Sequence, residues 1–324
     1  MRHPYLVDLN NPNDWLYPIE LIDPDGHKGE DQRTIHMPEG PDRLFCVTDS
    51  IMYPAAPGRA ETDMHCHEHQ YGWEDFFVDS GSMDLFVNGM KVVVTAGSII
   101  HLQPFEAHGM NFHTPVKYRG FFHGLSNSDN SPYLATIRAD NPDVMKDPEF
   151  PPRDRLGQSD MFLRESPIWK ETPVEQCSTI RHIDRPLATF KLDGVTLKMI
   201  TTRWENGGHC EMWAFEMDKG FSVASDKYPL HTEMYYVTAG QVKFKVINEE
   251  FTAGPECIVK IPKFARYTLA ASTDAVMYDV GGLARWQAYM YDRESVLQYD
   301  AERAKDPATF AGLRDKFGVQ LKIG

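Results

Sequence analysis

Short apolar runs separated by turn residues predict β-strands along most of the chain. Residues 1–60 carry such runs among many Pro, Asp and Gly residues, which predicts short strands added to a sheet. The next runs have strand length and cover residues 76–78, 83–87, 91–95, 98–102 and 118–122. Asn88-Gly89 lies between two of them and predicts a β-hairpin, because this pair favours a tight turn with positive φ.

A second β-rich region follows after an interval of different character. Its predicted strands are residues 188–192, 195–201, 213–217, 234–237, 242–246 and 257–261. Residues 126–187 between the two regions are polar and rich in Pro, with no sustained period, which is typical of a boundary. We therefore expect an N-terminal domain at 1–170 and a C-terminal domain at 171–324.

The end of the chain predicts a helix. Asp306 is a suitable N-cap for a helix that begins at Pro307, and Gly318 is suited to end it. Phe310, Leu313 and Phe317 would then share one face of this helix.

Composition narrows the class of protein. The chain has 324 residues, enough for two domains, and its 42% apolar and 25% charged residues are typical of an ordered soluble protein. The formal net charge of −14 argues against nucleic acid and anionic membranes as partners, because phosphate-binding surfaces need an excess of Lys and Arg.

The cysteines and the N-terminal residues predict a cytoplasmic location. The five cysteines show no CxxC spacing, which fits free thiols in a reducing compartment. We see no apolar run resembling a signal peptide and none long enough to span a bilayer.

Histidines and a glutamate form the clearest candidate chemistry. In an extended strand His65, His67 and His69 would point the same way, and Cys66 would point away from them. Glu74 follows closely, and His108 lies a strand or two later. Imidazole and carboxylate ligands together suit a first-row transition ion better than Mg²⁺ or Ca²⁺, so we predict a metal site.

The two β-rich regions match each other when they are aligned on Glu and Gly. Glu74 is followed by Gly81, Gly97, Pro104 and His108, and the second region repeats this order with Glu233, Gly240, Gly254, Pro262 and Arg266. An internal duplication of one β fold accounts for the match.

The motif His67-x-His69-x4-Glu74-x6-Gly81 resembles the first signature of the cupin superfamily. Gly97…Pro104-x3-His108-x2-Asn111 resembles the second signature, with Glu106 in place of the usual glycine. With the repeat, the chain resembles a bicupin over about residues 60–125 and 190–282. The resemblance implies an all-β fold of two antiparallel jelly-roll barrels with a C-terminal helical tail, and a homodimer, since cupins commonly dimerise.

The resemblance also implies the metal ligands His67, His69, Glu74 and His108. Taking His65 and His67 as the histidine pair would break the family spacing to Glu74, so His65 becomes a neighbour that supports the ligands or lines the mouth.

The second copy departs from the ligand pattern. Its aligned residues are Asp226, Tyr228, Glu233 and Arg266, so that only Glu233 is retained. We predict a buried ion pair between Glu233 and Arg266 in a C-terminal barrel without metal, since an arginine repels a cation. His231 shares a face with Glu233 and is a weaker candidate for a binding residue.

Further residues near the predicted metal site are candidates for a catalytic role. Arg119 and His123 share strand parity and are candidates to hold a carboxylate or relay protons, although a surface Arg and a packed His explain them equally well. The candidate catalytic set is therefore Glu74, Arg119, His123 and His65. His101 is left open, and the aromatic and Met residues near the motif fit either a pocket or plain core.

The expected function depends on one divalent transition metal, with iron first and Mn, Ni, Cu, Co or Zn as alternatives. Four protein ligands leave two adjacent positions of an octahedral ion open. The leading hypothesis is a dioxygenase that cleaves a small chelating substrate with O₂, with Glu74 as ligand and proton acceptor. The alternatives are non-redox isomerase, epimerase, lyase or hydrolase activity on a sugar-like acid, and a non-catalytic ligand-binding bicupin.

Among bicupins, gentisate-type dioxygenases and quercetinases are not distinguished by any feature of the sequence. Oxalate decarboxylases usually keep metal ligands in both halves, so the replacements at Asp226, Tyr228 and Arg266 argue against that activity.

Overall fold

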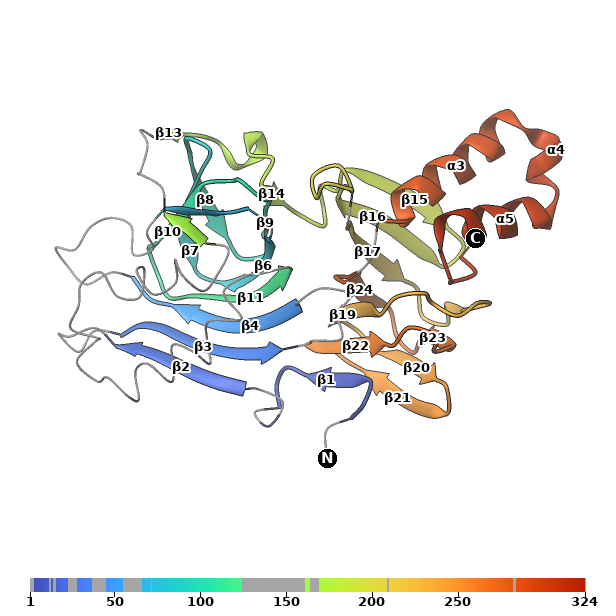
Figure 1. Ribbon diagram of the computed structural model, residues 1–324, viewed down its shortest axis with the longest axis horizontal. Helices are drawn as coiled ribbons and strands as arrows, with labels where there is room; N and C mark the ends of the chain where they lie inside the picture. The colour runs from blue at the N-terminus through green and yellow to red at the C-terminus, as the bar shows by residue number, and fades with distance from the viewer. Residues whose placement is uncertain are drawn as a thin grey trace. The chain divides into compact units, whose positions relative to one another are not determined.

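The computed structural model describes residues 3–11, 13, 16–22, 28–36, 45–54, 66–70, 72–123, 161–163, 169–208, 210–281 and 284–323. These residues are mostly β-strand, and their α-helices lie near the C-terminal end of the chain (Figure 1). The chain divides into two compact units. One comprises residues 15–38 and 43–182, and the other comprises 1–14, 39–42 and 183–324. We call them the N-terminal barrel and the C-terminal barrel.

The N-terminal barrel consists of two sheets. The seven-stranded sheet has the order β14 (Ile180–Arg181), β9 (Ile99–Leu102), β6 (Trp73–Ser80), β11 (Val116–His123), β4 (Phe45–Met52), β3 (Lys28–His36) and β2 (Leu16–Ile22). The six-stranded sheet has the order β12 (Met161–Leu163), β5 (His67–His69), β10 (His108–Phe112), β7 (Ser82–Val87), β8 (Met90–Thr95) and β13 (Lys170–Glu171). Neighbouring strands are antiparallel, apart from the short β8 and β13 pair.

Alternating side chains fill the interior of this barrel. Phe76 and Val78 of β6 join one apolar cluster with Leu85 of β7 and Leu102 of β9. Because side chains alternate along a strand, Trp73, Asp75 and Phe77 point to the other face of the seven-stranded sheet. Along β6, the even-numbered side chains therefore point into the barrel and the odd-numbered side chains point to its outer face.

The hairpin predicted at Asn88-Gly89 is confirmed. It connects β7 to β8, and both residues have positive φ, 49° for Asn88 and 74° for Gly89. This conformation matches the twist of the two strands and costs little strain in Asn and Gly.

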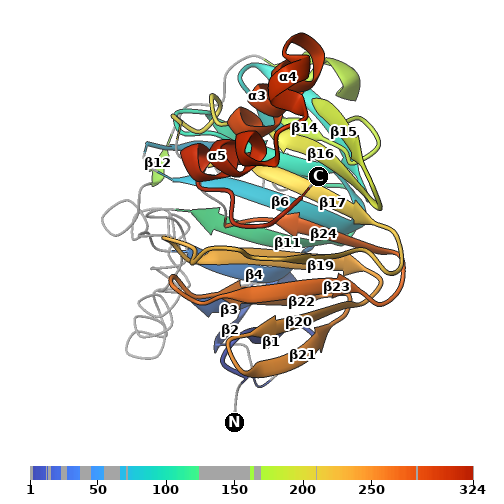
Figure 2. The ribbon, with the colours of Figure 1, turned by 90° about the vertical axis from the view of Figure 1, so that its right-hand side faces the viewer.

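The C-terminal barrel repeats the arrangement with fewer strands. Its seven-stranded sheet has the order β1 (Leu6–Asp8), β22 (Cys257–Ile261), β19 (Glu233–Ala239), β24 (Ala275–Asp279), β17 (Met212–Met217), β16 (Val195–Thr201) and β15 (Ala188–Leu192), seen strand by strand in Figure 2. Its four-stranded sheet has the order β18 (Ser222–Ala224), β23 (Tyr267–Ala271), β20 (Val242–Val246) and β21 (Glu249–Ala253). The first strand of the chain, β1, therefore belongs to the later barrel, where it pairs with β22.

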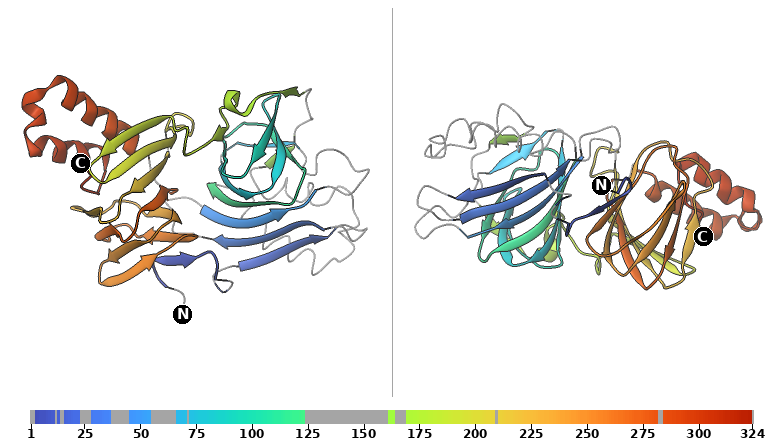
Figure 3. Two further views of the ribbon diagram at one scale, coloured as in Figure 1. Left: turned by 180° about the vertical axis from the view of Figure 1, so that it is seen from behind. Right: turned by 90° about the horizontal axis from the view of Figure 1, so that it is seen from below.

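Three helices end the described chain: α3 (Trp286–Tyr299), α4 (Ala301–Ala304) and α5 (Pro307–Phe317), grouped on the C-terminal barrel in Figure 3. Trp286, Tyr289 and Leu313 join the apolar core of that barrel. The predicted helix is confirmed as α5, since Asp306 accepts a hydrogen bond from the Ala308 amide at 2.9 Å and Gly318 ends the helix with φ of 67°. None of the described helices is long and apolar enough to cross a membrane.

Each predicted strand overlaps an observed one, so the all-β class with a helical tail is confirmed. The described strands and α-helices that were not among the predicted elements are strands β10, β12, β13, β14, β18, β21, β23 and β24 and helices α3 and α4.

Candidate metal centre

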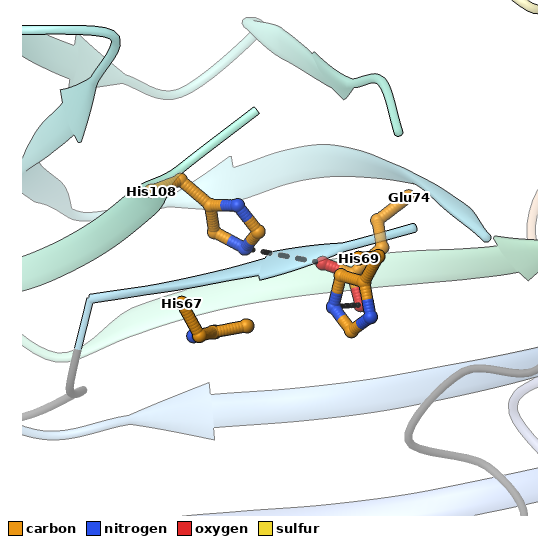
Figure 4. A group of neighbouring side chains, drawn as sticks. All are labelled: His67, His69, Glu74 and His108. Atoms are coloured by element: carbon orange, nitrogen blue, oxygen red, sulfur yellow. Dashed lines mark ion pairs between the residues drawn. The ribbon is translucent and has the colours of Figure 1, made fainter. Parts of the chain in front are cut away.

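Four side chains of the N-terminal barrel converge on one point. They are His67 and His69 of β5, Glu74 of β6 and His108 of β10, and one candidate ligand atom from each lies within 4.8 Å of all the others (Figure 4). Each of the four residues is 2% exposed. Within the described part of the chain, no other group of His, Cys, Asp and Glu side chains meets this condition.

Strand register places these side chains. His67 and His69 alternate on β5, and His67 lies directly opposite His108 on β10. The ring centroids of His67 and His108 are 4.3 Å apart, and those of His69 and His108 are 5.8 Å apart. Glu74 reaches the same point from the other sheet, so the group joins the two layers of the barrel.

The Glu74 carboxylate interacts with two of the imidazoles. Its Oε1 lies 3.2 Å from His69 Nε2, and its Oε2 lies 3.5 Å from His108 Nε2 (Figure 4). Burial alone would raise the pKa of Glu74, but the adjacent His69 and His108 outweigh it and hold this pKa well below its usual range. Glu74 is therefore ionised at neutral pH.

The environment of His108 fits a bound cation. Its Nδ1 lies 2.9 Å from the carbonyl oxygen of Glu106, which can only accept, so Nδ1 carries a proton. In neutral His108 the lone pair of Nε2 then faces the Glu74 carboxylate. The Nε2 lone pair and the carboxylate are both acceptors, so they can face each other when a cation lies between them. Three imidazoles and one carboxylate are a suitable donor set for a divalent transition ion.

Glu106 fixes this geometry although it replaces the glycine of the family motif. Its Oε1 accepts from Asn88 Nδ2 at 2.9 Å and Thr179 Oγ1 at 3.3 Å, and its Oε2 accepts from the Gln103 amide at 2.8 Å. These bonds hold the turn that presents the Glu106 carbonyl to His108. In the sequence, the only sign of this role of Glu106 was that a glutamate replaces the usual glycine of the motif.

Apolar side chains surround the group on the interior face. Leu102 and Phe122 lie directly beside Glu74 on the neighbouring strands and are buried, at 1% and 2% exposed. Phe76 and Met83 belong to the same core, whereas Phe105 is 65% exposed. The centre therefore lies in a dry environment, where electrostatic interactions are strengthened.

Arg119 and His123 lie on the opposite face of the sheet from Glu74. Glu74 pairs with Phe122, so the odd-numbered residues of β11 point away from the four-residue group. Arg119 forms an ion pair with Asp49, and His123 stacks on Trp73 at 4.9 Å. Both side chains therefore point to the face of the sheet opposite the candidate ligand Glu74.

His101 belongs to this outer face too. Its Nδ1 lies 2.6 Å from Asp75 Oδ1, and His123 Nε2 lies 3.7 Å from Asp75 Oδ2. His65 lies outside the described residues.

In the C-terminal barrel, Tyr267 occupies the position of His108. His108 lies opposite Val87 on β7, and Tyr267 lies opposite Val246 on the corresponding strand β20. The residues just before them also match, since Ala107 O accepts from the Asn88 amide and Arg266 O accepts from the Ile247 amide. The sequence alignment that matched His108 with Arg266 is therefore wrong by one residue.

The predicted ion pair between Glu233 and Arg266 is also wrong. Arg266 is exposed and its guanidinium lies 4.5 Å from the ring centroid of Tyr228. Glu233 is buried and pairs instead with Arg285, at 3.1 Å between Oε1 and Nη2. Its Oε2 accepts hydrogen bonds from the hydroxyls of Tyr235 and Tyr267, whose pKa values are raised well above the usual range, first by burial and then by the Glu233 charge.

Comparisons with known proteins show the fold. No protein-family model and no curated protein matches the chain. Oxalate decarboxylase from Bacillus subtilis at pH 4.6 aligns with a TM-score of 0.51 and 11% identity, covering 86% of this chain and 76% of that one. The formate complex of the Lactobacillus farciminis enzyme aligns with a TM-score of 0.51 and 11% identity, covering 96% of both chains.

A further B. subtilis oxalate decarboxylase structure, described for its Mn(II) centres, has a TM-score of 0.50 and 11% identity and covers 86% of this chain and 77% of that one. The likeness to these structures concerns the fold alone, and it confirms the expected fold of two antiparallel jelly-roll barrels.

Proposed function

We propose that this protein is a metal-dependent enzyme that binds one divalent transition ion through His67, His69, Glu74 and His108 and acts on a small acid by non-redox chemistry, as a lyase. The observation that carries the proposal is the convergence of these four buried side chains. The carboxylic acid is inferred from the structural neighbours, which are described as oxalate decarboxylases, one of them in complex with formate.

Manganese is the first choice of metal. A neighbour of the same fold is described with Mn(II) centres, whereas the preference for iron rested on the ligand set alone. A divalent ion in this position would polarise an acid that chelates it with two oxygens.

The side chains of the N-terminal barrel supply the surroundings of the reaction. Glu74 is ionised and provides the negative charge that balances a cation. Leu102 and Phe122 limit access of water to the centre. Arg119 and His123 face away from it, so we assign them a positioning role, holding β11 in register with β4 through Asp49 and with β6 through Asp75.

Lyase activity is favoured over the dioxygenase expected from the sequence. The dioxygenase hypothesis depended on the set of three imidazoles and one carboxylate. Non-redox metal enzymes use the same set, so it does not favour a dioxygenase over a lyase. The replaced ligands of the C-terminal barrel argued against a decarboxylase, but the centre of the N-terminal barrel is complete by itself.

The test is to load the purified protein with Mn(II) and supply oxalate and small 2-hydroxy and 2-oxo acids while CO₂ and O₂ are measured together. We expect CO₂ release without stoichiometric O₂ uptake, abolished by His67→Ala and retained by His113→Ala, a matched control at an exposed histidine. One O₂ consumed per substrate would establish the dioxygenase instead, and tight ligand binding without turnover would establish a binding protein.

A further inference from the structure

The C-terminal barrel contains a buried cation of its own, the guanidinium of Arg285. Arg285 is 2% exposed. Its Nη2 lies 2.9 Å from Asp279 Oδ2 and 3.1 Å from Glu233 Oε1, and its Nη1 lies 2.5 Å from His231 Nε2. The guanidinium thus has two carboxylates and one imidazole around it.

This position corresponds to the metal centre of the N-terminal barrel. Glu233 begins β19 and precedes Gly240 by seven residues, as Glu74 precedes Gly81, and each carboxylate faces the residue at the His108 or Tyr267 position. The carboxylate that lies among imidazoles in one barrel therefore lies beside a guanidinium in the other.

The start of helix α3 positions Arg285 beside these side chains. The carboxylate of Glu211 accepts hydrogen bonds from the backbone amides of Arg285, Trp286 and Gln287, which caps the helix and fixes its first turn. Trp286 Nε1 also donates to Asp279 Oδ2 at 3.0 Å. The guanidinium is held in place by the backbone as well as by its ion pairs.

The buried carboxylates require a cation. Glu233 and Asp279 are 1% and 0% exposed, and an unbalanced charge at such depth is very costly. The second carboxylate oxygen of Asp279, Oδ1, is buried and has no hydrogen-bond partner, within the described part of the chain. The three atoms that contact the guanidinium, Asp279 Oδ2, Glu233 Oε1 and His231 Nε2, are of the types that divalent transition ions bind. With the guanidinium between them, they do not meet the distance condition that the four candidate ligand atoms of the N-terminal barrel meet.

We propose that Arg285 is the resident cation of the C-terminal barrel, and that His231, Glu233 and Asp279 form a latent site for a divalent transition ion that this guanidinium keeps closed. One barrel is balanced by an exchangeable metal and the other by a cation that belongs to the chain. The C-terminal barrel is thereby independent of metal supply, and the protein binds one metal per chain.

The experiment removes the first site so that only the C-terminal barrel can bind. Variants are prepared in a His67→Ala, His108→Ala background, equilibrated with Mn(II) or Zn(II), freed of unbound metal and analysed for metal content. We expect no metal in the background protein, close to one equivalent after adding Arg285→Ala, and none after adding Arg285→Lys, which retains a cation. Adding Glu233→Ala to the Arg285→Ala protein should abolish the binding, and free methylguanidinium should compete with the metal.

Removing Arg285 leaves two carboxylates without a counter-charge, so thermal unfolding is followed with and without metal. A higher Tm of the Arg285→Ala protein in the presence of Zn(II), absent from the Arg285→Lys protein, supports the proposal. A folded Arg285→Ala protein without bound metal overturns it. An Arg285→Ala protein that remains unfolded at every metal concentration also overturns it, because the position would then require the guanidinium itself.

Discussion

His108 and Tyr267 occupy equivalent places in the two barrels, and the exchange of one side chain changes the chemistry there. The imidazole offers a lone pair to a cation, whereas the phenol donates a hydrogen bond to Glu233. Sequence alignment missed this pair because it matched Pro104 with Pro262. The turns actually correspond at Phe105 and Phe264, which both have φ of 66°. The left-handed residue determines the turn, and the proline is free to shift by one position.

Metal content should distinguish the two barrels at single residues. His67→Ala and His108→Ala should each lose the bound metal, since each removes one of four ligands. His231→Ala should retain one metal per chain, because His231 interacts with Arg285 in the other barrel. Elemental analysis of the three proteins checks this. Equal loss in all three would contradict a single centre in the N-terminal barrel.

Glu106 should affect metal affinity without being a ligand. Glu106→Ala removes the bonds that hold the turn before His108, and we expect a loss of affinity of about 10- to 100-fold. Glu106→Gln keeps an acceptor for Asn88 but not for the Gln103 amide, so its loss should be smaller. Competition with a fluorescent chelator measures both, and Glu171→Ala, at an exposed glutamate of β13, is the control. Unchanged affinity in Glu106→Ala would show that the turn holds itself.

Asp279 should give the protein a distinct pH dependence of stability. Burial raises the pKa of this carboxyl to about 6 from 3.8, with Arg285 and the Trp286 hydrogen bond opposing the rise and Glu233 and Glu211 adding to it. A pKa raised by folding means that the folded protein binds the proton more tightly. The stabilisation that the folded protein gains by binding this proton is complete below about pH 4 and is lost as the pH rises through about 6.

Asp279→Asn removes this titration. From pH 5 to pH 7.5 the free energy of unfolding of the variant should therefore rise relative to that of the native protein, by roughly 1.4 kcal/mol. Urea unfolding at the two pH values measures the difference. A difference that stays constant would show that Arg285 keeps Asp279 ionised throughout.

At the scale of elements, the sequence predicted strands and the last helix well but missed helix α3. Helix α5 carries its own signals, Asp306 at the start and Gly318 at the end. Helix α3 begins after Arg285, whose side chain forms no capping bond to the helix, and Glu211 caps it from far along the chain. A cap supplied by tertiary structure leaves no local mark, so no reading of residues 286–299 alone could place this helix.

The ends of α5 should be individually measurable. Asp306→Ala removes the N-cap bond to Ala308 and should cost about 1 kcal/mol of the free energy of unfolding. Gly318→Ala forces a Cβ into a left-handed conformation and should cost about the same. Thermal unfolding checks both, with exposed Lys263→Ala as the control. A Tm equal to the control in both variants would show that α5 is held by packing alone.

At the scale of the whole molecule, the two compact units do not follow the order of the chain. The sequence predicted a boundary at residue 170, and it gave no sign that β1 joins the C-terminal barrel, because pairing partners about 250 residues apart share no local pattern. The internal repeat and the first histidine motif were recoverable because both depend on short, fixed spacings. The outward direction of Arg119 and His123 required the register of β11 against β6.

Leu9 should therefore stabilise the barrel that is distant from it in sequence. Leu9 follows β1, is 0% exposed, and its amide bonds to the Glu256 carbonyl at 2.8 Å. Leu9→Ala should cost about 3 kcal/mol. Hydrogen exchange should show faster opening of β22 and β19 and no change in β6 and β11. Uniform loss of protection in both barrels would mean that they unfold as one unit.

The pairing of β1 with β22 also sets an order on events at the ribosome. Leu6 is made about 250 residues before its partner Val259, which corresponds to roughly 10 to 50 s at ordinary rates of translation. The described strands of the N-terminal barrel, from β2 to β14, are all made within that interval, while β1 has no β22 to pair with. Pairing of β1 is thus a late, long-range step in completing the second barrel, and an unpaired strand that waits that long is a place where a chaperone would protect the newborn chain.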